Sequence, residues 1–258
     1  MLPIENELAL AAFAVLTGLA LGTLGAGGAI LALPAFKYAA HLPQREASAT
    51  SLLVVGSAAL IGGLMTLRRC QRDPDEARPD FKVALPFLVS GLLGSWGGAM
   101  LSKFVPELAL KLLFGAVVLA AAEAMYLRAM APPHTKEPRT IPFWITPIVG
   151  LLMGMLTGLV GVGGGFLIVP TLTTATTLTL KRAAATSVWI ITGNAAAALV
   201  GYIGHVHIGW GLAGAFLAIA IVGMSLGQRL ARHANPKTLQ LAFAAFLVVI
   251  GIVTFLKP

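Results

Sequence analysis

The sequence contains little charge and almost no cysteine, and each shortage excludes a class of protein. Asp, Glu, Lys and Arg make up 11% of the 258 residues, whereas soluble domains carry roughly 25%. A chain that is 57% hydrophobic cannot cover a water-facing surface with so few charges. Cys70 is the single cysteine, so an internal disulfide and a cysteine metal cluster are excluded. Together these shortages indicate an integral membrane protein rather than a soluble or disulfide-stapled domain.

The first seven residues also lack Lys and Arg, and they carry Glu5 and Glu7. We therefore expect no cleavable signal peptide at this end. The net charge of +8 comes from Lys and Arg that lie between apolar runs, which favours a role in membrane topology over nucleic-acid binding.

Apolar runs are what the sequence has in abundance. A membrane-spanning helix needs about 20 apolar residues, and eight stretches come close to this length. We therefore expect an all-α, polytopic membrane protein with helical segments near residues 8–24, 47–67, 83–101, 108–127, 143–160, 183–203, 208–226 and 239–256.

The two halves of the chain resemble each other. A shift of 136 residues, which superimposes Gly18 on Gly154, also aligns a set of glycine, proline and hydroxyl positions without a gap. The set pairs Gly22, Gly25, Gly27, Gly28, Pro34, Thr50 and Ser51 with Gly158, Gly161, Gly163, Gly164, Pro170, Thr186 and Ser187. We interpret this as a duplication, with membrane repeats at residues 1–128 and 142–258 joined by a cytoplasmic linker at 129–141.

The distribution of Lys and Arg predicts that the repeats are inverted. If all eight stretches cross, the basic residues divide nine against nine. If the first stretch of each repeat breaks at its glycines and returns, they divide thirteen against five, and the positive-inside rule makes the richer face cytoplasmic. We expect this arrangement in the plasma membrane with both termini outside, although residues 143–160 are long enough to cross. Broken helices at equivalent places in inverted repeats are typical of secondary transporters.

The glycine runs are the first candidate binding segments. Consecutive glycines allow a turn and expose backbone N–H groups, and a helix that starts after them presents the positive end of its dipole. Two such ends could bind an anion near the membrane midplane. Close helix packing through small residues is the alternative. The predicted backbone ligands are Gly25, Gly27, Gly28, Gly161, Gly163, Gly164 and Gly165.

Polar side chains provide the second set of candidates. Thr50, Ser51, Thr186 and Ser187 lie near the start of the following helices, where their hydroxyls could donate to an anion or bond their own helix backbone. Asn194 lies in the middle of an apolar stretch, and amides at that depth usually face the bundle interior.

Charged residues form the third set. Arg45, Lys181 and Arg182 stand at helix entrances, where they could funnel an anion or anchor the helices at the interface. Glu123, five residues before Arg128, could carry a coupling proton or lie among the headgroups. We expect no metal and no cofactor, because His205 and His207 have no accompanying Cys or paired carboxylate.

These motifs resemble the TauE/SafE family of sulfite and organosulfur anion exporters. The resemblance rests on the spacing from Gly18 to Gly28 with Pro34 and on its copy from Gly158 to Gly165 with Pro170. The later segments 97–101 and 227–230, each followed by a proline, also look similar. It implies a plasma-membrane permease for small sulfur-containing anions such as sulfite or sulfonates.

The sequence therefore predicts a secondary transporter that moves a small anion by alternating access. The alternatives are an anion channel with the same site, a membrane scaffold without a pathway, and an intramembrane enzyme, which the absence of an acid–base arrangement disfavours. Import or export, the coupling ion and homo-oligomer formation stay open.

Overall fold

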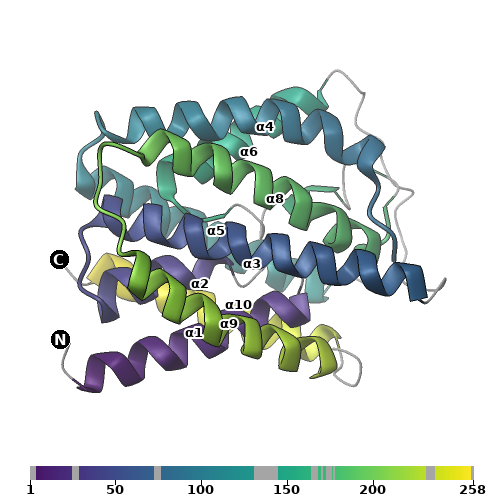
Figure 1. The fold of residues 1–258 in the computed structure, drawn as a ribbon, viewed down its shortest axis with the longest axis horizontal. Helices are drawn as coiled ribbons and strands as arrows, with labels where there is room; N and C mark the ends of the chain where they lie inside the picture. The colour runs from purple at the N-terminus through teal and green to yellow at the C-terminus, as the bar shows by residue number, and fades with distance from the viewer. Residues whose placement is uncertain are drawn as a thin grey trace.

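The computed structural model is a bundle of long helices, which confirms the predicted all-α architecture (Figure 1). The structure describes residues 4–24, 29–72, 77–130, 145–163, 168–169, 171–172, 176, 178–230 and 236–256. Each of the eight apolar stretches expected from the sequence coincides with a helix. In chain order the helices are α1 (Ile4–Leu24), α2 (Ala29–Pro34), the π-helix η1 (Ala35–Ala39), α3 (Gln44–Arg72), α4 (Phe81–Ser102), α5 (Glu107–Met130), α6 (Thr146–Val160), α8 (Leu180–Tyr202), α9 (Trp210–Leu230) and α10 (Pro236–Leu256).

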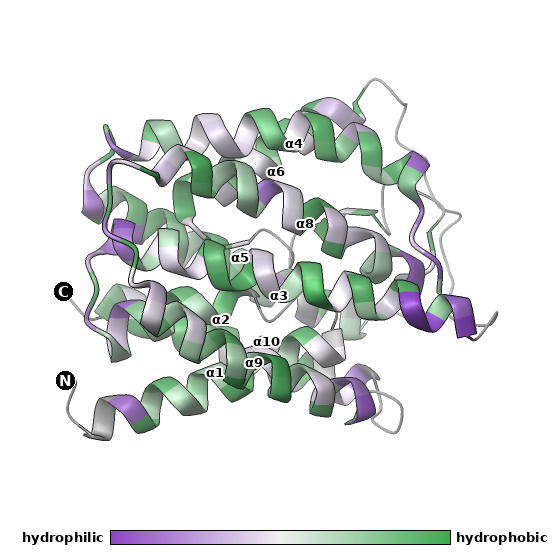
Figure 2. Ribbon diagram, in the orientation of Figure 1, coloured by the Kyte–Doolittle hydropathy of each residue, from purple (hydrophilic) through white to green (hydrophobic). Residues whose placement is uncertain are grey.

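The described helices have the length and composition of membrane helices. Four of them, α3, α4, α8 and α9, are long and apolar enough to cross a bilayer by themselves. Large apolar side chains also stand on their outer surfaces, such as Leu93 and Val222, which are 65% and 62% exposed. In Figure 2 the hydrophobic colour follows the helix bodies, and the hydrophilic colour gathers at the helix ends. This distribution fits a bundle whose sides face lipid.

The two halves of the chain are interleaved. The first helix of each half packs against a helix of the other half, α1 on α9 and α6 on α4. Small residues bring these backbones together, because a Cβ on Gly22 would overlap Met224 of α9, and a Cβ on Gly158 would overlap Ser95 of α4. Small residues at such contacts are the usual device for close helix packing in membranes. This is the packing role that the sequence offered as the alternative for glycine.

Corresponding helices of the two halves run in opposite directions. In the α3–α8 contact, Gly56 lies against Ala195 and Gly63 lies against Trp189, so one residue number rises as the other falls. The α5–α10 contact has the same sense, with Gly115 against Phe255 and Leu119 against Gly251. Antiparallel pairing of equivalent helices is what an inverted repeat requires.

The bundle has two distinct ends. Figure 1 shows the N- and C-termini together at one end, which we call the terminal face, and we call the opposite end the basic face. Helix α1 runs from the terminal face toward the basic face, and Lys37 of η1 donates to Gln44 at the start of α3, which is again at the terminal face. Among the described residues, Lys37, Arg45, Lys103 and Lys111 belong to the terminal face, whereas the basic face carries Arg68, Arg69, Arg72, Arg78, Lys82, Lys181, Arg182, Arg229 and Lys237.

Candidate functional site

The first helix of the second half breaks at a glycine. Helix α6 ends at Val160, and Gly161 follows in the left-handed conformation with φ 76°. The Gly161 N–H donates to the Thr157 carbonyl at 2.9 Å. Only glycine adopts this conformation without strain, so the position of the break is encoded by Gly161.

Hydroxyl groups from two other helices cover the broken end of α6. Ser48 of α3 donates to the Val160 carbonyl at 2.9 Å, and Ser51 donates to the Gly161 carbonyl. Tyr202 of α8 donates to the Gly158 carbonyl at 2.9 Å. The last carbonyls of a helix have no partners within the helix, and inside a membrane no water is available to replace them. These three buried side chains therefore make the interruption stable in the bundle.

In the first half, α1 ends at Leu24 and α2 starts at Ala29. Of the predicted backbone ligands, Gly25, Gly27, Gly28, Gly164 and Gly165 lie outside the described residues. Gly163 is described and lies against Val55 of α3.

Asn194 is an unusual polar group among the described residues. It is 1% exposed in the middle of α8, and within that part of the chain neither its amide oxygen nor its amide nitrogen has a hydrogen-bond partner. Its side chain lies against α4, where a Cβ on Gly91 would come within 2.5 Å of Asn194 Oδ1. Thr17 of α1, Thr50 of α3, Ser95 of α4 and Trp189 of α8 also bury a polar atom for which the described residues provide no partner. Buried polar groups are normally paired, so Asn194, with both amide atoms unpaired, is the clearest candidate for a ligand contact.

The other predicted hydroxyls bond the protein itself. Thr186 donates to the Arg182 carbonyl at 2.7 Å and accepts from the Asp80 N–H at 2.9 Å. Ser187 donates to the Ala184 carbonyl at 2.9 Å. These are backbone contacts of the kind that serine and threonine make in helices.

The predicted charged residues lie apart from Asn194. Arg45 donates to the carbonyls of Lys103 and Val105 at 3.1 and 2.9 Å, which holds the turn between α4 and α5 at the terminal face. On the basic face, Arg182 forms an ion pair with Asp80 at 3.2 Å.

The remaining predicted groups are on the surface. Lys181 is exposed beside Arg182, and Glu123 stands on an exposed side of α5. His205 and His207 lie exposed in the turn after α8. Within the described part of the chain, no group of three or more His, Cys, Asp or Glu is placed to hold a metal ion.

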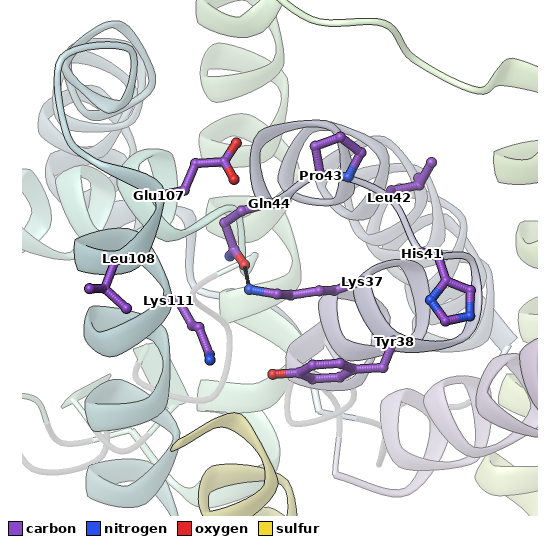
Figure 3. Close-up of a pocket in the computed structure, with 9 residues that line it drawn as sticks. All are labelled: Lys37, Tyr38, His41, Leu42, Pro43, Gln44, Glu107, Leu108 and Lys111. Atoms are coloured by element: carbon purple, nitrogen blue, oxygen red, sulfur yellow. Dashed lines mark hydrogen bonds between the residues drawn. The ribbon is translucent and has the colours of Figure 1, made fainter. Parts of the chain in front are cut away.

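A cavity of about 640 Å³ opens at the terminal face, between the η1–α3 turn and the start of α5. Figure 3 shows the Lys37 and Lys111 ammonium groups and the Tyr38 hydroxyl turned toward a shared space. In the sequence, both lysines contribute only to the count of basic residues on one face. The signal that could have indicated this cavity is Lys111, a charge inside the apolar stretch 108–127. The full lining consists of Lys37, Tyr38, His41, Leu42, Pro43, Gln44, Glu107, Leu108 and Lys111.

Comparison with known proteins gives a consistent result. The family model described as "Sulfite exporter TauE/SafE" matches residues 10–254. A "Probable membrane transporter protein" of Xylella fastidiosa is 29% identical, and the match covers 92% of this chain and 90% of the relative. "Probable membrane transporter protein YunE" of Bacillus subtilis is 26% identical, and the match covers 92% of this chain and 94% of the relative. "Probable membrane transporter protein MJ0441" of Methanocaldococcus jannaschii is 31% identical over 64% of each chain. No solved structure matches.

Proposed function

Because the chain belongs to the sulfite exporter TauE/SafE family, we propose that it is a secondary transporter for a small sulfur-containing anion of the sulfite or sulfonate type. The family description and the transporter names of its relatives support the transport role. Alternating access is supported by the inverted pairing of α3 with α8 and of α5 with α10, since two inverted halves can exchange conformations around a central site. No catalytic role is assigned.

The substrate site lies in the bundle interior, between the two helix breaks. Asn194 is the observation that carries this assignment, because its amide is buried and unpaired in the middle of α8. An unsatisfied buried polar group costs about 1–3 kcal/mol, and an anion with several oxygen acceptors offers its amide N–H₂ the missing partner. Thr50 supplies an unpaired hydroxyl as a second donor. In this proposal the N–H groups of Gly25, Gly27, Gly28, Gly163, Gly164 and Gly165 complete the site.

The orientation follows from charge. The basic face carries most of the described Lys and Arg, so we place it in the cytoplasm and both termini outside the plasma membrane. The repeats extend over residues 1–128 and 142–258. A negative cell interior then drives anion export, with ~2.3 kcal/mol per charge and 100 mV available.

Flux measurements in proteoliposomes test the transport proposal. We expect the purified protein to move sulfite, thiosulfate or sulfoacetate when the three are tested beside small carboxylates. A protein that moves none of these anions is not the proposed transporter. Flux that far exceeds the rate of a conformational cycle would instead indicate a channel with the same site.

Substitution of Asn194 tests the location of the site. We expect Asn194→Ala to lower flux at least about tenfold, the effect of losing about 1.4 kcal/mol of binding. Thr192→Val is the matched control, because Thr192 lies on the same helix and its hydroxyl bonds the Val188 carbonyl. Wild-type flux in Asn194→Ala would remove this residue from the site.

A further inference from the structure

Polar side chains gather just beneath the terminal face, around the broken end of α6. Ser48 of α3, Ser102 of α4 and Tyr202 of α8 are at most 2% exposed, and each lies within about a turn of the end of its helix at this face. Arg45 precedes Ser48 by three residues and lies nearer to the face. We call these four residues the terminal hydroxyl cluster, and they come from both halves of the chain.

Contacts of this cluster join the two halves. Ser48, in the first half, donates to the Val160 carbonyl in the second half at 2.9 Å. The Tyr202 hydroxyl, in the second half, lies close enough to Ser48 and Ser102 of the first half to interact with both side chains. A movement of one half against the other, as alternating access requires, would separate these groups and free their hydroxyl donors.

Covering the end of α6 does not account for the whole cluster. Exposed helix carbonyls need donors, and Ser48, Ser51 and Tyr202 already supply them. Ser102 donates to the Ala99 carbonyl of its own helix at 2.6 Å, so its approach to Tyr202 adds a polar contact that α6 does not require. Polar groups that exceed structural need within a membrane protein indicate a substrate path.

Arg45 gives the cluster a positive charge. Its guanidinium donates to the carbonyls of Lys103 and Val105, and because these partners are neutral, the charge is retained. No carboxylate of the described residues lies within ion-pair distance of Arg45. Arg45 also acts electrostatically on the Tyr202 hydroxyl. A path beside Tyr202 therefore favours an anion over a cation.

We propose that the terminal hydroxyl cluster is the gate through which the transported anion crosses the terminal face, with the Ser48, Ser102 and Tyr202 hydroxyls binding the oxygens of a sulfonate or sulfite group when the halves separate there. This inference rests on the proposed transport function and adds the residues of its route to the terminal face. In the structure the gate is closed, because the three hydroxyls are buried and bond the protein. On opening, each hydroxyl exchanges a carbonyl acceptor for an anion oxygen, so its hydrogen bond is kept.

Thiol labelling of the purified protein in detergent tests the gate without requiring transport. Ser102→Cys is combined with Cys70→Ser, so that the chain carries one thiol. The probes are two methanethiosulfonates of similar size, one bearing a sulfonatoethyl and the other a trimethylammonioethyl group. Each rate is divided by the rate of the same probe with free 2-mercaptoethanol. We expect both probes to react, with the normalised rate at least about tenfold higher for the sulfonate.

Thr254→Cys, also combined with Cys70→Ser, is the matched control. Thr254 is as buried as Ser102, lies near the same face at the end of α10, and donates to the Ile250 carbonyl of its own helix at 2.8 Å. It is not part of the cluster, so we expect its thiol variant to stay unmodified while Ser102→Cys reacts.

Substitution of Arg45 tests the charge preference at the gate. In Arg45→Gln the ratio of the two normalised rates should fall toward one, because the attracting charge is lost. Arg45→Lys keeps the charge and should keep the preference. A looser turn between α4 and α5 would change both rates together, so the ratio reports the charge and not the loss of the two carbonyl contacts.

The outcomes separate the gate from the transport function. Labelling of Ser102→Cys with a sulfonate preference that depends on Arg45 supports the gate even if the protein moves none of the anions tested. A Ser102→Cys variant as unreactive as Thr254→Cys overturns the gate even if flux is normal. Equal normalised rates for the two probes, a preference that survives Arg45→Gln, or equal labelling of Thr254→Cys would each overturn it as well.

Discussion

The two halves of the molecule share their helix packing but differ in how hydroxyl side chains are used. At the end of α6, Ser48, Ser51 and Tyr202 donate to carbonyls of a different helix. The positions that correspond to them in the 136-residue register are Ala184, Ser187 and Thr66. Ser187 and Thr66 both donate to carbonyls of their own helices, and Ser51 makes the equivalent contact to Ser48 in addition to its bond to Gly161. The duplication has therefore kept the scaffold, while the hydroxyl contacts of Ser48, Ser51 and Tyr202 with the end of α6 distinguish the second half.

Removal of the two serines should have the largest effect. Ser48→Ala with Ser51→Ala leaves the Val160 and Gly161 carbonyls without these donors, and we expect the free energy of unfolding to fall by about 2–5 kcal/mol. Thermal unfolding in detergent measures the loss. Ser187→Ala is the control, and we expect it to be nearly neutral because its bond stays within one helix. Equal losses in both variants would show that the difference between the halves is unimportant for stability.

Substitution of the packing glycines tests whether the two halves pack their first helices in the same way. Gly22→Ala and Gly158→Ala each place a Cβ against the backbone of a neighbouring helix, and we expect each to destabilise the bundle by about 1–3 kcal/mol. Gly97→Ala is the control, since a Cβ there meets nothing within 4 Å. Unfolding measurements on the three variants should give two similar losses and one near zero. A large inequality between Gly22 and Gly158 would contradict equivalent packing in the two halves.

Tyr202→Phe should have a smaller effect. The ring stays in place while the hydroxyl that donates to Gly158 is lost, so we expect a destabilisation of about 1 kcal/mol. Thr66→Val removes a hydroxyl at the corresponding position of the first half, where it bonds the Gly62 carbonyl at 2.9 Å. Comparison of their unfolding midpoints tests whether the hydroxyl contact across helices contributes more than the one within a helix.

The charged residues at the helix entrances should have the smallest effects. The Arg182–Asp80 ion pair is partly exposed, with 47% and 25% of the two side chains accessible, so Arg182→Gln should cost less than about 1 kcal/mol. Arg45→Gln should cost more, because Arg45 bonds two backbone carbonyls. Unfolding at low and high salt measures both variants. A larger loss for Arg182 would reverse this order.

The parts of the fold that the sequence predicts are those with a local pattern. The length of each apolar stretch indicates a helix, and one register relates the two halves. The placement of Lys and Arg then predicts that the halves are inverted. The partners of the glycines do not follow. Gly22 packs on α9 while Gly161 ends α6, and both are simply glycine in the sequence.

The candidate site was harder to predict because its contacts join distant residues. Ser51 and Gly161 are 110 positions apart, and no local pattern shows that this hydroxyl donates to a helix end rather than to a ligand. Lys111 was visible as a charge in an apolar stretch, but no local pattern shows that it is buried and lines a cavity with residues of η1. Asn194 could be singled out because a lone amide among apolar residues is recognisable without any partner.

The interleaving of the two halves has a consequence for biosynthesis. Helix α1 leaves the ribosome long before α9, yet the surface on which Gly18 and Gly22 pack belongs to α9, some two hundred residues later in the chain. Helix α1 therefore stays in the membrane without this partner until α9 has been synthesised. A fragment that ends before α9 lacks the partner, so α1 reaches its final position later than its place in the chain suggests.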